Sequence, residues 1–167
     1  MPDMNLQIAL AVLPDAVAIR DTLEQSRAWM ASLGENHWLL PFQLEWIVQK
    51  IGAGEFWMVR MNGQIAGEFR LIHSDPDFWG EDDGDCLYFH TFSIRREFAG
   101  QNLGSQVLDW VKGYARSLGK RYLRLDTPAK NPLLNAYYKN AGFSGVAQMP
   151  LRGIEWTLFQ FELGIAH

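Results

Sequence analysis

The chain has 167 residues and a formal net charge of −4, with 48% hydrophobic and 20% charged residues. This balance predicts one globular domain, residues 1–167, long enough to bury a core of ordinary size. The acidic charge without a basic run excludes a typical nucleic-acid-binding surface, and no apolar run is long enough to cross a bilayer.

The first half of the chain reads as strands and amphipathic helices in alternation. Pro14 and Asp15 predict a helix start, Gly34 predicts its end, and Asn62-Gly63 is a strong hairpin signal. Pro41 opens a second helix, which ends at residues 52–54. We expect strands at residues 6–12, 56–61 and 64–72, and helices at residues 14–33 and 42–51.

The second half begins with a polar loop, residues 74–85, that carries Pro76, Gly80 and Gly84. Further strands and helices follow it, and Pro150 and Gly153 join the last two strands. The mixture of elements predicts an α/β three-layer domain with a mixed sheet. We expect strands at 87–94, 122–126, 143–149 and 154–163, and helices at 105–118 and 131–140.

The stretch from Leu87 to Leu118 has the order strand, glycine-bearing loop, helix. An apolar run ends at Ile94, and apolar residues then recur at three- and four-residue steps from Leu103 onward. Such a loop leaves backbone N–H groups unpaired at the helix N-terminus, where an anion is favoured. Phosphate is the usual anion in this position.

Two common phosphate-binding loops do not fit this stretch. A P-loop requires Gly-x-x-x-x-Gly-Lys-[Ser/Thr], but Gly100 and Gly104 are too close together and Ser105-Gln106 follows. A dinucleotide fingerprint requires Gly-x-Gly-x-x-Gly and an acidic residue about twenty positions later. Asp126 lies at roughly that distance, but the glycine pattern is missing.

The loop resembles the pyrophosphate loop of the GNAT superfamily of N-acetyltransferases, usually written [Gln/Arg]-x-x-Gly-x-[Gly/Ala]. Here Ala99 stands in place of the Gln or Arg, Asn102 in place of the first Gly, and Gly104 at the last position. Asn tolerates positive φ better than most residues, so the turn can persist. A second segment, residues 131–143, resembles the family's later signature: an Asn, a Tyr seven residues on, and then Gly-Phe.

The resemblance covers roughly residues 63–143. It implies a single α/β/α domain whose mixed, mostly antiparallel sheet splays at its central strands, and it implies acetyl-CoA as the cofactor. Some of the implied cofactor-binding residues also have another explanation. Paired arginines in a turn, such as Arg95 and Arg96, are often only solvated, and an Asn before a proline, such as Asn131 before Pro132, is often a helix cap. The implied cofactor-binding groups are the backbone N–H groups of Phe92 and Ile94, the residues Arg95, Arg96, Gly100, Gln101, Asn102, Leu103, Gly104 and Ser105, and the side chains of Asn131 and Tyr138.

Attack of an amine on a thioester needs a base, a donor to the carbonyl oxygen and an acid for the leaving thiolate. His90 is the first base candidate, because an imidazole titrates near neutrality. It is similar in position to a histidine of the arylalkylamine branch, in a His-x-Leu-Ala-Val pattern that here reads His90-Thr-Phe-Ser-Ile94. Glu68 and water are the other base candidates, and a core role for His90 is the alternative. By resemblance Tyr138 is the acid; the alternative is packing on the sheet, with Tyr137 expected as the core member of the pair.

The polar loop is rich in carboxylates. An EF-hand counted from Asp75 fails, because Trp79 and Cys86 stand where oxygen ligands belong, and the four histidines lack zinc spacing, so we predict no metal site. The loop is either ordinary solvated surface or a region that attracts a cationic amine acceptor. In the second case Trp29, Trp38 and Trp79 could line the entrance for the acceptor and contact it through cation–π interactions. Its carboxylates are Asp75, Asp77, Glu81, Asp82, Asp83 and Asp85.

The sequence therefore predicts an enzyme that moves an acetyl group from acetyl-CoA to a primary amine. The competing prediction is a non-catalytic acyl-CoA-binding sensor, which the departures at Ala99 and Asn102 favour and the presence of His90 and Tyr138 disfavours. The expected partner is a small-molecule amine, and exposed strand edges make a homodimer plausible. With Cys86 as the single cysteine and no signal-peptide pattern at the start of the sequence, we expect a cytoplasmic protein.

Overall fold

The computed structural model describes residues 5–35 and 41–164. The chain forms two compact units, which we call unit 1 (residues 1–71 and 91–103) and unit 2 (residues 72–90 and 104–167). Each is described by itself below. Among the described residues, no helix has the length and apolar character that a membrane span requires.

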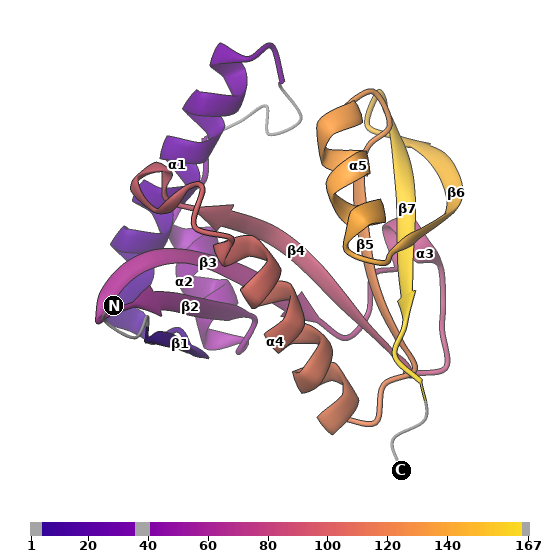
Figure 1. The fold of residues 1–167 in the computed structure, drawn as a ribbon, viewed down its shortest axis with the longest axis horizontal. Coiled ribbons are helices and arrows are strands. Elements are labelled where there is room, and N and C mark those ends of the chain that lie inside the picture. The colour runs from indigo at the N-terminus through magenta and orange to yellow at the C-terminus, as the bar shows by residue number, and fades with distance from the viewer. Residues whose placement is uncertain (1–4, 36–40, 165–167) are drawn as a thin grey trace. The chain divides into compact units, whose positions relative to one another are not determined.

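The described residues form seven strands, labelled with the helices in Figure 1. The strands are β1 (Leu6–Leu10), β2 (Phe56–Met61), β3 (Gln64–Ile72), β4 (Cys86–Ile94), β5 (Tyr122–Pro128), β6 (Ser144–Leu151) and β7 (Ile154–Glu162). The helices are α1 (Ala16–Ser32), α2 (Leu44–Gly52), α3 (Pro76–Trp79), α4 (Leu103–Ser117) and α5 (Pro132–Asn140), with 3-10 turns η1 (Leu13–Asp15) and η2 (Arg96–Phe98).

The strands make one open mixed sheet in the order β1-β2-β3-β4-β5-β7-β6. The pairs β1–β2, β2–β3, β5–β7 and β6–β7 are antiparallel, whereas β4 and β5 run parallel. This arrangement confirms the predicted α/β class with a mixed, mostly antiparallel sheet.

Unit 1 has an apolar core between its two long helices and β2. Ile19 and Leu23 on α1 and Ile47 on α2 are fully buried together with Phe56 and Met58 on β2. Fully burying an aliphatic or aromatic side chain contributes about 1.5–3 kcal/mol. The i, i+4 spacing of the two α1 residues is the pattern that predicted this helix.

In unit 2 the parallel strands pair over a short distance only. The register joins Cys86 to Tyr122, Leu87 to Leu123 and Tyr88 to Arg124, and goes no further along the strands. The next residues with side chains on the Tyr88 and Arg124 face are His90 and Asp126, because side chains alternate along a strand. Both therefore follow the point at which β4 and β5 stop pairing, where a splay was expected.

Several boundaries differ from the prediction for local reasons. The second helix begins at Leu44 rather than at residue 42, because the Phe42 N–H donates to Glu24 Oε1 at 2.7 Å and the chain is extended at Gln43. The loop before β4 contains the short helix α3, and β5 continues to Pro128, two residues beyond its predicted end.

The strand before the last hairpin ends at Leu151, two residues later than predicted, whereas the start of the last strand at Ile154 was predicted correctly. Pro150 lies inside β6, an edge strand that tolerates a proline because one row of its N–H groups pairs with no strand. The turn is made by Arg152 and the predicted Gly153, both at positive φ (51° and 79°). The Asn62-Gly63 turn was predicted correctly, with φ of 52° and 80°.

Candidate active site

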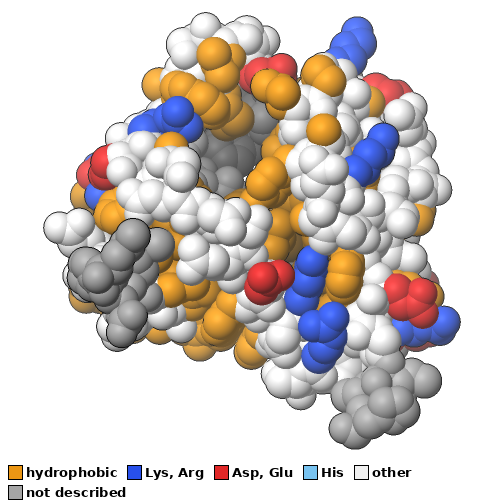
Figure 2. Space-filling model, viewed as in Figure 1, with side chains coloured by type: hydrophobic (Ala, Val, Ile, Leu, Met, Phe, Trp, Pro, Cys, Tyr) orange, Lys and Arg blue, Asp and Glu red, His pale blue; other side chains and the backbone are white. Residues whose placement is uncertain are grey.

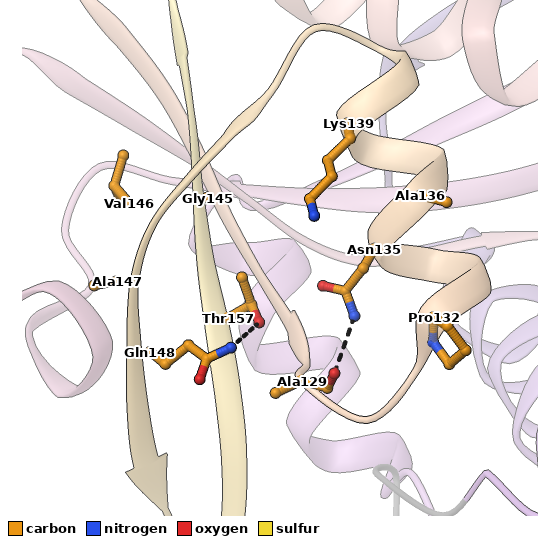
Figure 3. Close-up of a pocket in the computed structure, with 10 residues that line it drawn as sticks. All are labelled: Ala129, Pro132, Asn135, Ala136, Lys139, Gly145, Val146, Ala147, Gln148 and Thr157. Atoms are coloured by element: carbon orange, nitrogen blue, oxygen red, sulfur yellow. Dashed lines mark hydrogen bonds between the residues drawn. The ribbon is translucent and has the colours of Figure 1, made fainter.

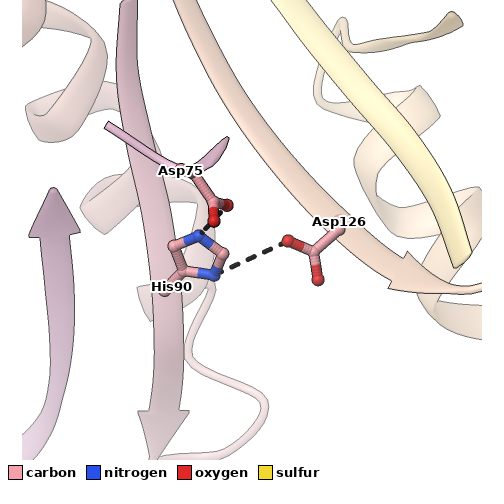
Figure 4. Close-up of side chains that lie close together, drawn as sticks. All are labelled: Asp75, His90 and Asp126. Carbon is pink, nitrogen blue, oxygen red and sulfur yellow. Dashed lines mark hydrogen bonds and ion pairs between the residues drawn. The ribbon is translucent and has the colours of Figure 1, made fainter. Parts of the chain in front are cut away.

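His90 lies between two carboxylates in unit 2 (Figure 4). Its Nε2 is 2.7 Å from Asp75 Oδ2, a hydrogen-bond distance, and its Nδ1 is 3.6 Å from Asp126 Oδ2. His90 comes from β4, Asp126 from β5, and Asp75 from the residue before α3. The side chains are 17%, 8% and 11% exposed respectively, so His90 is the most accessible of the three. We call this group the Asp75–His90–Asp126 triad.

The environment of Asp126 disfavours its charge. Burial raises the pKa of this carboxyl to about 6, with His90 acting against the rise and Asp75 adding to it. Asp126 Oδ2 is buried and has no hydrogen-bond partner among the described residues. An unpaired buried carboxylate is costly, and strongly perturbed carboxyls cluster at functional sites.

The triad has the residue types of a metal site but not the geometry. Its three groups offer ligand atoms within 4.8 Å of one another. However, the two ring nitrogens of His90 point to opposite sides, each toward a different carboxylate (Figure 4). One ion could bind only one of these nitrogens, so the three ligands do not converge as a tetrahedral zinc site requires. The arrangement suits proton transfer better than metal binding.

The sequence prediction found His90 but missed its two partners. Asp75 was grouped with the acidic loop, and Asp126 was considered only as the acidic residue of a dinucleotide fingerprint that did not fit. A signal was present, because the carboxyl ends of adjacent parallel strands meet at one edge of a sheet. That rule brings the end of β5, and therefore Asp126, close to His90.

Tyr138 is almost completely buried in unit 2. Its ring packs edge-on against Tyr137 and Phe143, with centroids 5.2 and 5.7 Å apart. Burial raises the pKa of Tyr138, with smaller contributions from Tyr137 and Asp126. The hydroxyl is thereby kept protonated, as a proton donor must be.

The expectation that Tyr137 is the core member of the pair is wrong. Tyr137 is half-buried, and its hydroxyl hydrogen-bonds to Ser105, the last residue of the predicted phosphate loop. Burial raises the pKa of Tyr137, and the Ser105 bond acts against the rise. Asn131 caps α5, since its side chain accepts a hydrogen bond from the Leu134 N–H at 3.1 Å; its contact with the cofactor stays a prediction.

The loop before α4 has the backbone of a turn that exposes a helix N-terminus. Gly100 and Asn102 adopt positive φ, 80° and 58°, so Asn102 performs the role expected of the family's glycine. Residues 99–102 are exposed, and the first turn of α4 contains no acidic residue. A 15-residue helix whose first N–H groups are not opposed by a carboxylate fits a pyrophosphate group.

The backbone of β4 is strained beside His90. Thr91 has φ of 55°, which is a genuine outlier for a β-branched residue. Such strain costs about 1–3 kcal/mol and collects at functional sites. Within unit 1, Arg70 Nη1 donates to Thr91 Oγ1 at 3.3 Å and helps to hold this conformation. The irregularity immediately precedes Phe92, whose backbone N–H was predicted to contact the cofactor, as was that of Ile94; both contacts stay predictions.

The two arginines of the predicted phosphate site already have partners in unit 1. Arg95 Nε donates to Thr22 Oγ1 at 2.8 Å on α1, and the Arg96 guanidinium lies 3.9 Å over the Trp29 ring. Glu68 is fully buried, and burial raises its pKa well above the usual value, with Arg95 acting against the rise. Its oxygens have no hydrogen-bond partner among the described residues. Since Glu68 has no exposed surface, it remains the weaker base candidate.

Part of the acidic loop is bound to the sheet. Asp82 contacts the Tyr88 hydroxyl and accepts from the Gly84 N–H, and these bonds, Tyr88 first, lower the pKa of Asp82. Arg124 lies 4.3 Å over the Trp79 ring, so this ring already faces a cation of the chain. Trp38 lies outside the described residues. The exposed carboxylates of the loop are Asp77, Glu81 and Asp83.

A cavity of about 670 Å³ lies between α5 and the β6–β7 hairpin (Figure 3). Asn135 and Lys139 project toward it from α5, and Gln148 and Thr157 line it from the strands. None of the predicted site residues lines it. The face drawn in Figure 2 carries its Lys and Arg side chains in small separate groups.

Comparisons with known proteins agree with the fold and the motifs. The model of the acetyltransferase (GNAT) family matches residues 21–143. The chain is 30% identical over 141 residues to an uncharacterized N-acetyltransferase, YesJ of Bacillus subtilis, and the match covers 80% of this chain and 78% of that protein.

Two solved structures show the same fold. A GNAT-family acetyltransferase from Listeria monocytogenes matches with a TM-score of 0.80 and 25% identity, over 94% of each chain. The yncA protein of Salmonella typhimurium, solved with its cofactor acetyl-CoA, matches with a TM-score of 0.67 and 20% identity, over 95% of this chain and 94% of that one. The chain therefore belongs to the GNAT family of acetyltransferases.

Proposed function

We propose that the protein transfers an acetyl group from acetyl-CoA to a primary amine. The observation that carries the proposal is the triad, a histidine held between two carboxylates where β4 and β5 stop pairing. Family membership supports acetyl-CoA as the donor, and the similarity to a protein named as an N-acetyltransferase supports an amine as the acceptor.

Each step of the transfer has a candidate group. Acetyl-CoA supplies the thioester that the amine attacks. His90 takes a proton from the amine nitrogen, and the backbone N–H groups of Phe92 and Ile94 donate to the carbonyl oxygen. Tyr138 gives its hydroxyl proton to the departing thiolate and regains one from the attacking nitrogen, which loses its second proton as the amide forms. A panel of primary amines assayed with acetyl-CoA, following free thiol, tests this function directly.

Cofactor binding has its own expected result. Acetyl-CoA should raise the melting temperature, because a ligand that binds only the native state stabilises it. Gly104→Asp should abolish this shift, since it places a carboxylate in the first turn of α4, where the phosphates are expected. Differential scanning fluorimetry measures both effects.

The matched control is Gly113→Asp, the same substitution further along α4. Gly113 is exposed and an added Cβ there meets open space. Acetyl-CoA should still raise the melting temperature of the Gly113→Asp variant. Equal shifts in the Gly104 variant and the unmodified protein would remove the loop from the cofactor site.

The exposed carboxylates of the acidic loop favour a cationic acceptor. For a polyamine, kcat/KM should fall as ionic strength rises, because exposed charges are screened beyond about 10 Å at 0.1 M salt. The double substitution Glu81→Gln/Asp83→Asn should flatten this dependence. A neutral-tailed amine that reacts faster than every polyamine, without salt dependence, would contradict this choice of acceptor.

A further inference from the structure

We propose that Asp75 and Asp126 are positioning residues that make His90 the base: Asp75 fixes the ring tautomer, and the buried Asp126 stabilises the imidazolium that forms. This inference rests on the proposed function and deepens it. It also adds to the site two residues that sequence reasoning did not assign.

The contact with Asp75 determines which ring nitrogen carries the proton. At 2.7 Å the Nε2···Oδ2 distance is that of a charge-assisted hydrogen bond. A carboxylate can only accept, so Nε2 is the donor, and the lone pair of a neutral ring is left on Nδ1. Asp75 thus sets both the ring orientation and the nitrogen that can take a proton.

The contact with Asp126 determines where positive charge is favoured. Nδ1 faces Asp126 Oδ2 at 3.6 Å, too far for a direct hydrogen bond but close enough for strong electrostatic attraction. The oxygen is buried and has no partner among the described residues, so its charge is not already neutralised by another group. A proton added at Nδ1 turns a costly unpaired carboxylate into one half of an ion pair.

The proton balance is simple. One N–H bond of the acceptor ammonium breaks, and one N–H bond forms at Nδ1 of His90, which becomes an imidazolium between two carboxylates. His90 is the most exposed member of the triad, so the proton enters there and both carboxylates act through the ring.

Few other charges face this ring within unit 2. The Phe78 ring of α3 lies with its centroid 6.4 Å from that of His90, and it carries no charge. Tyr138 of α5 is coupled to Asp126 and stays neutral because burial raises its pKa. Asp75 and Asp126 are therefore the charged groups in contact with His90 among the described residues of unit 2.

The test is the pH titration of the His90 ring signal by NMR, with the signal assigned from its loss in His90→Gln. Asp126→Asn keeps the shape of the side chain and removes its charge. We expect the His90 signal of this variant to titrate at lower pH than that of the unmodified protein, because the charge that faces Nδ1 at 3.6 Å is removed. The acid limb of the kcat/KM profile should move by the same amount, whereas Asp109→Asn on the exposed face of α4 should move neither.

Melting temperatures separate this role from a purely structural one. Burial raises the pKa of Asp126 to about 6, above the value of about 3.9 for an unfolded chain. The ionised form therefore costs the folded state stability as pH rises from about 4 to about 6, and the cost is complete above that range. Asp126→Asn should melt at a higher temperature than the unmodified protein at pH 8, and the difference should vanish toward pH 4.

The outcomes distinguish this inference from the proposed function. A shifted midpoint with no acetylated amine would support the triad coupling while removing the transfer reaction. An unshifted midpoint and acid limb in a folded, active Asp126→Asn would overturn the inference and leave the transfer intact. A variant that melts lower at both pH values, with an unmoved midpoint, would also overturn it and assign Asp126 to folding.

Discussion

Tyr138→Phe is expected to lower kcat by about 100- to 10,000-fold, the usual range for acid–base catalysis, while the affinity for acetyl-CoA barely changes. The substitution removes only the hydroxyl. The ring that packs against Phe143 and Phe159, with centroids 5.7 and 6.3 Å away, is retained. Loss of the proton donor to the thiolate should therefore appear in turnover and not in binding.

A packing role for Tyr138 gives the opposite result. The residue is buried enough for packing to be its whole purpose, in which case stability would fall and turnover per folded molecule would be preserved. Measuring kcat and melting temperature on one preparation separates the two roles. Tyr122→Phe, on a half-buried residue at the start of β5, is the matched control and should keep normal turnover. Normal turnover in the Tyr138 variant would leave water or another side chain as the donor.

Gly67→Ala should be among the most destabilising single-methyl additions in the chain. Within unit 1, a Cβ at Gly67 of β3 would lie 2.2 Å from the backbone oxygen of Ser93 and 3.2 Å from Cα of Ile94, both in β4. Backbone atoms of a paired strand cannot turn away as a flexible side chain can. We expect a loss of about 3 kcal/mol, the upper part of the usual range for overpacking, and a melting temperature about 10 °C lower.

Gly113→Ala is the matched control for this substitution. The added methyl group meets open space in the middle of α4, and replacing a glycine in a helix interior stabilises by up to about 1 kcal/mol. The two variants should therefore move the melting temperature in opposite directions. If the Gly67→Ala variant had the same melting temperature as the unmodified protein, β3 and β4 would not be as close as described.

Most of the fold could be predicted from the sequence, because turns, helix ends and helix faces are each determined by neighbouring residues. The Asn62-Gly63 turn, the stop at Gly34 and the apolar stripe of α4 each follow from a few neighbouring residues, and each was predicted. The backbone at Asn102 was also anticipated. Its φ of 58° is positive, as expected for an Asn that stands where the family has a glycine.

What the sequence did not show depends on contacts between distant segments. Asp75 precedes His90 by fifteen residues and Asp126 follows it by thirty-six, so neither could be paired with it by spacing alone. Phe42 is kept out of α2 by a carboxylate eighteen residues earlier. The burial of Tyr138 in place of Tyr137 was likewise decided by tertiary packing, because adjacent residues in one helix have similar local preferences.

The most direct test is a mass balance under multiple turnover, with acetyl-CoA and the amine panel in large excess over the protein. Free CoA thiol and acetylated amine are measured in the same quenched samples. Acetyl transfer predicts equal amounts of the two products, each many times the amount of protein. If acetyl-CoA raises the melting temperature while thiol release with every amine stays at the rate without protein, the chain is an acyl-CoA-binding sensor and not an N-acetyltransferase.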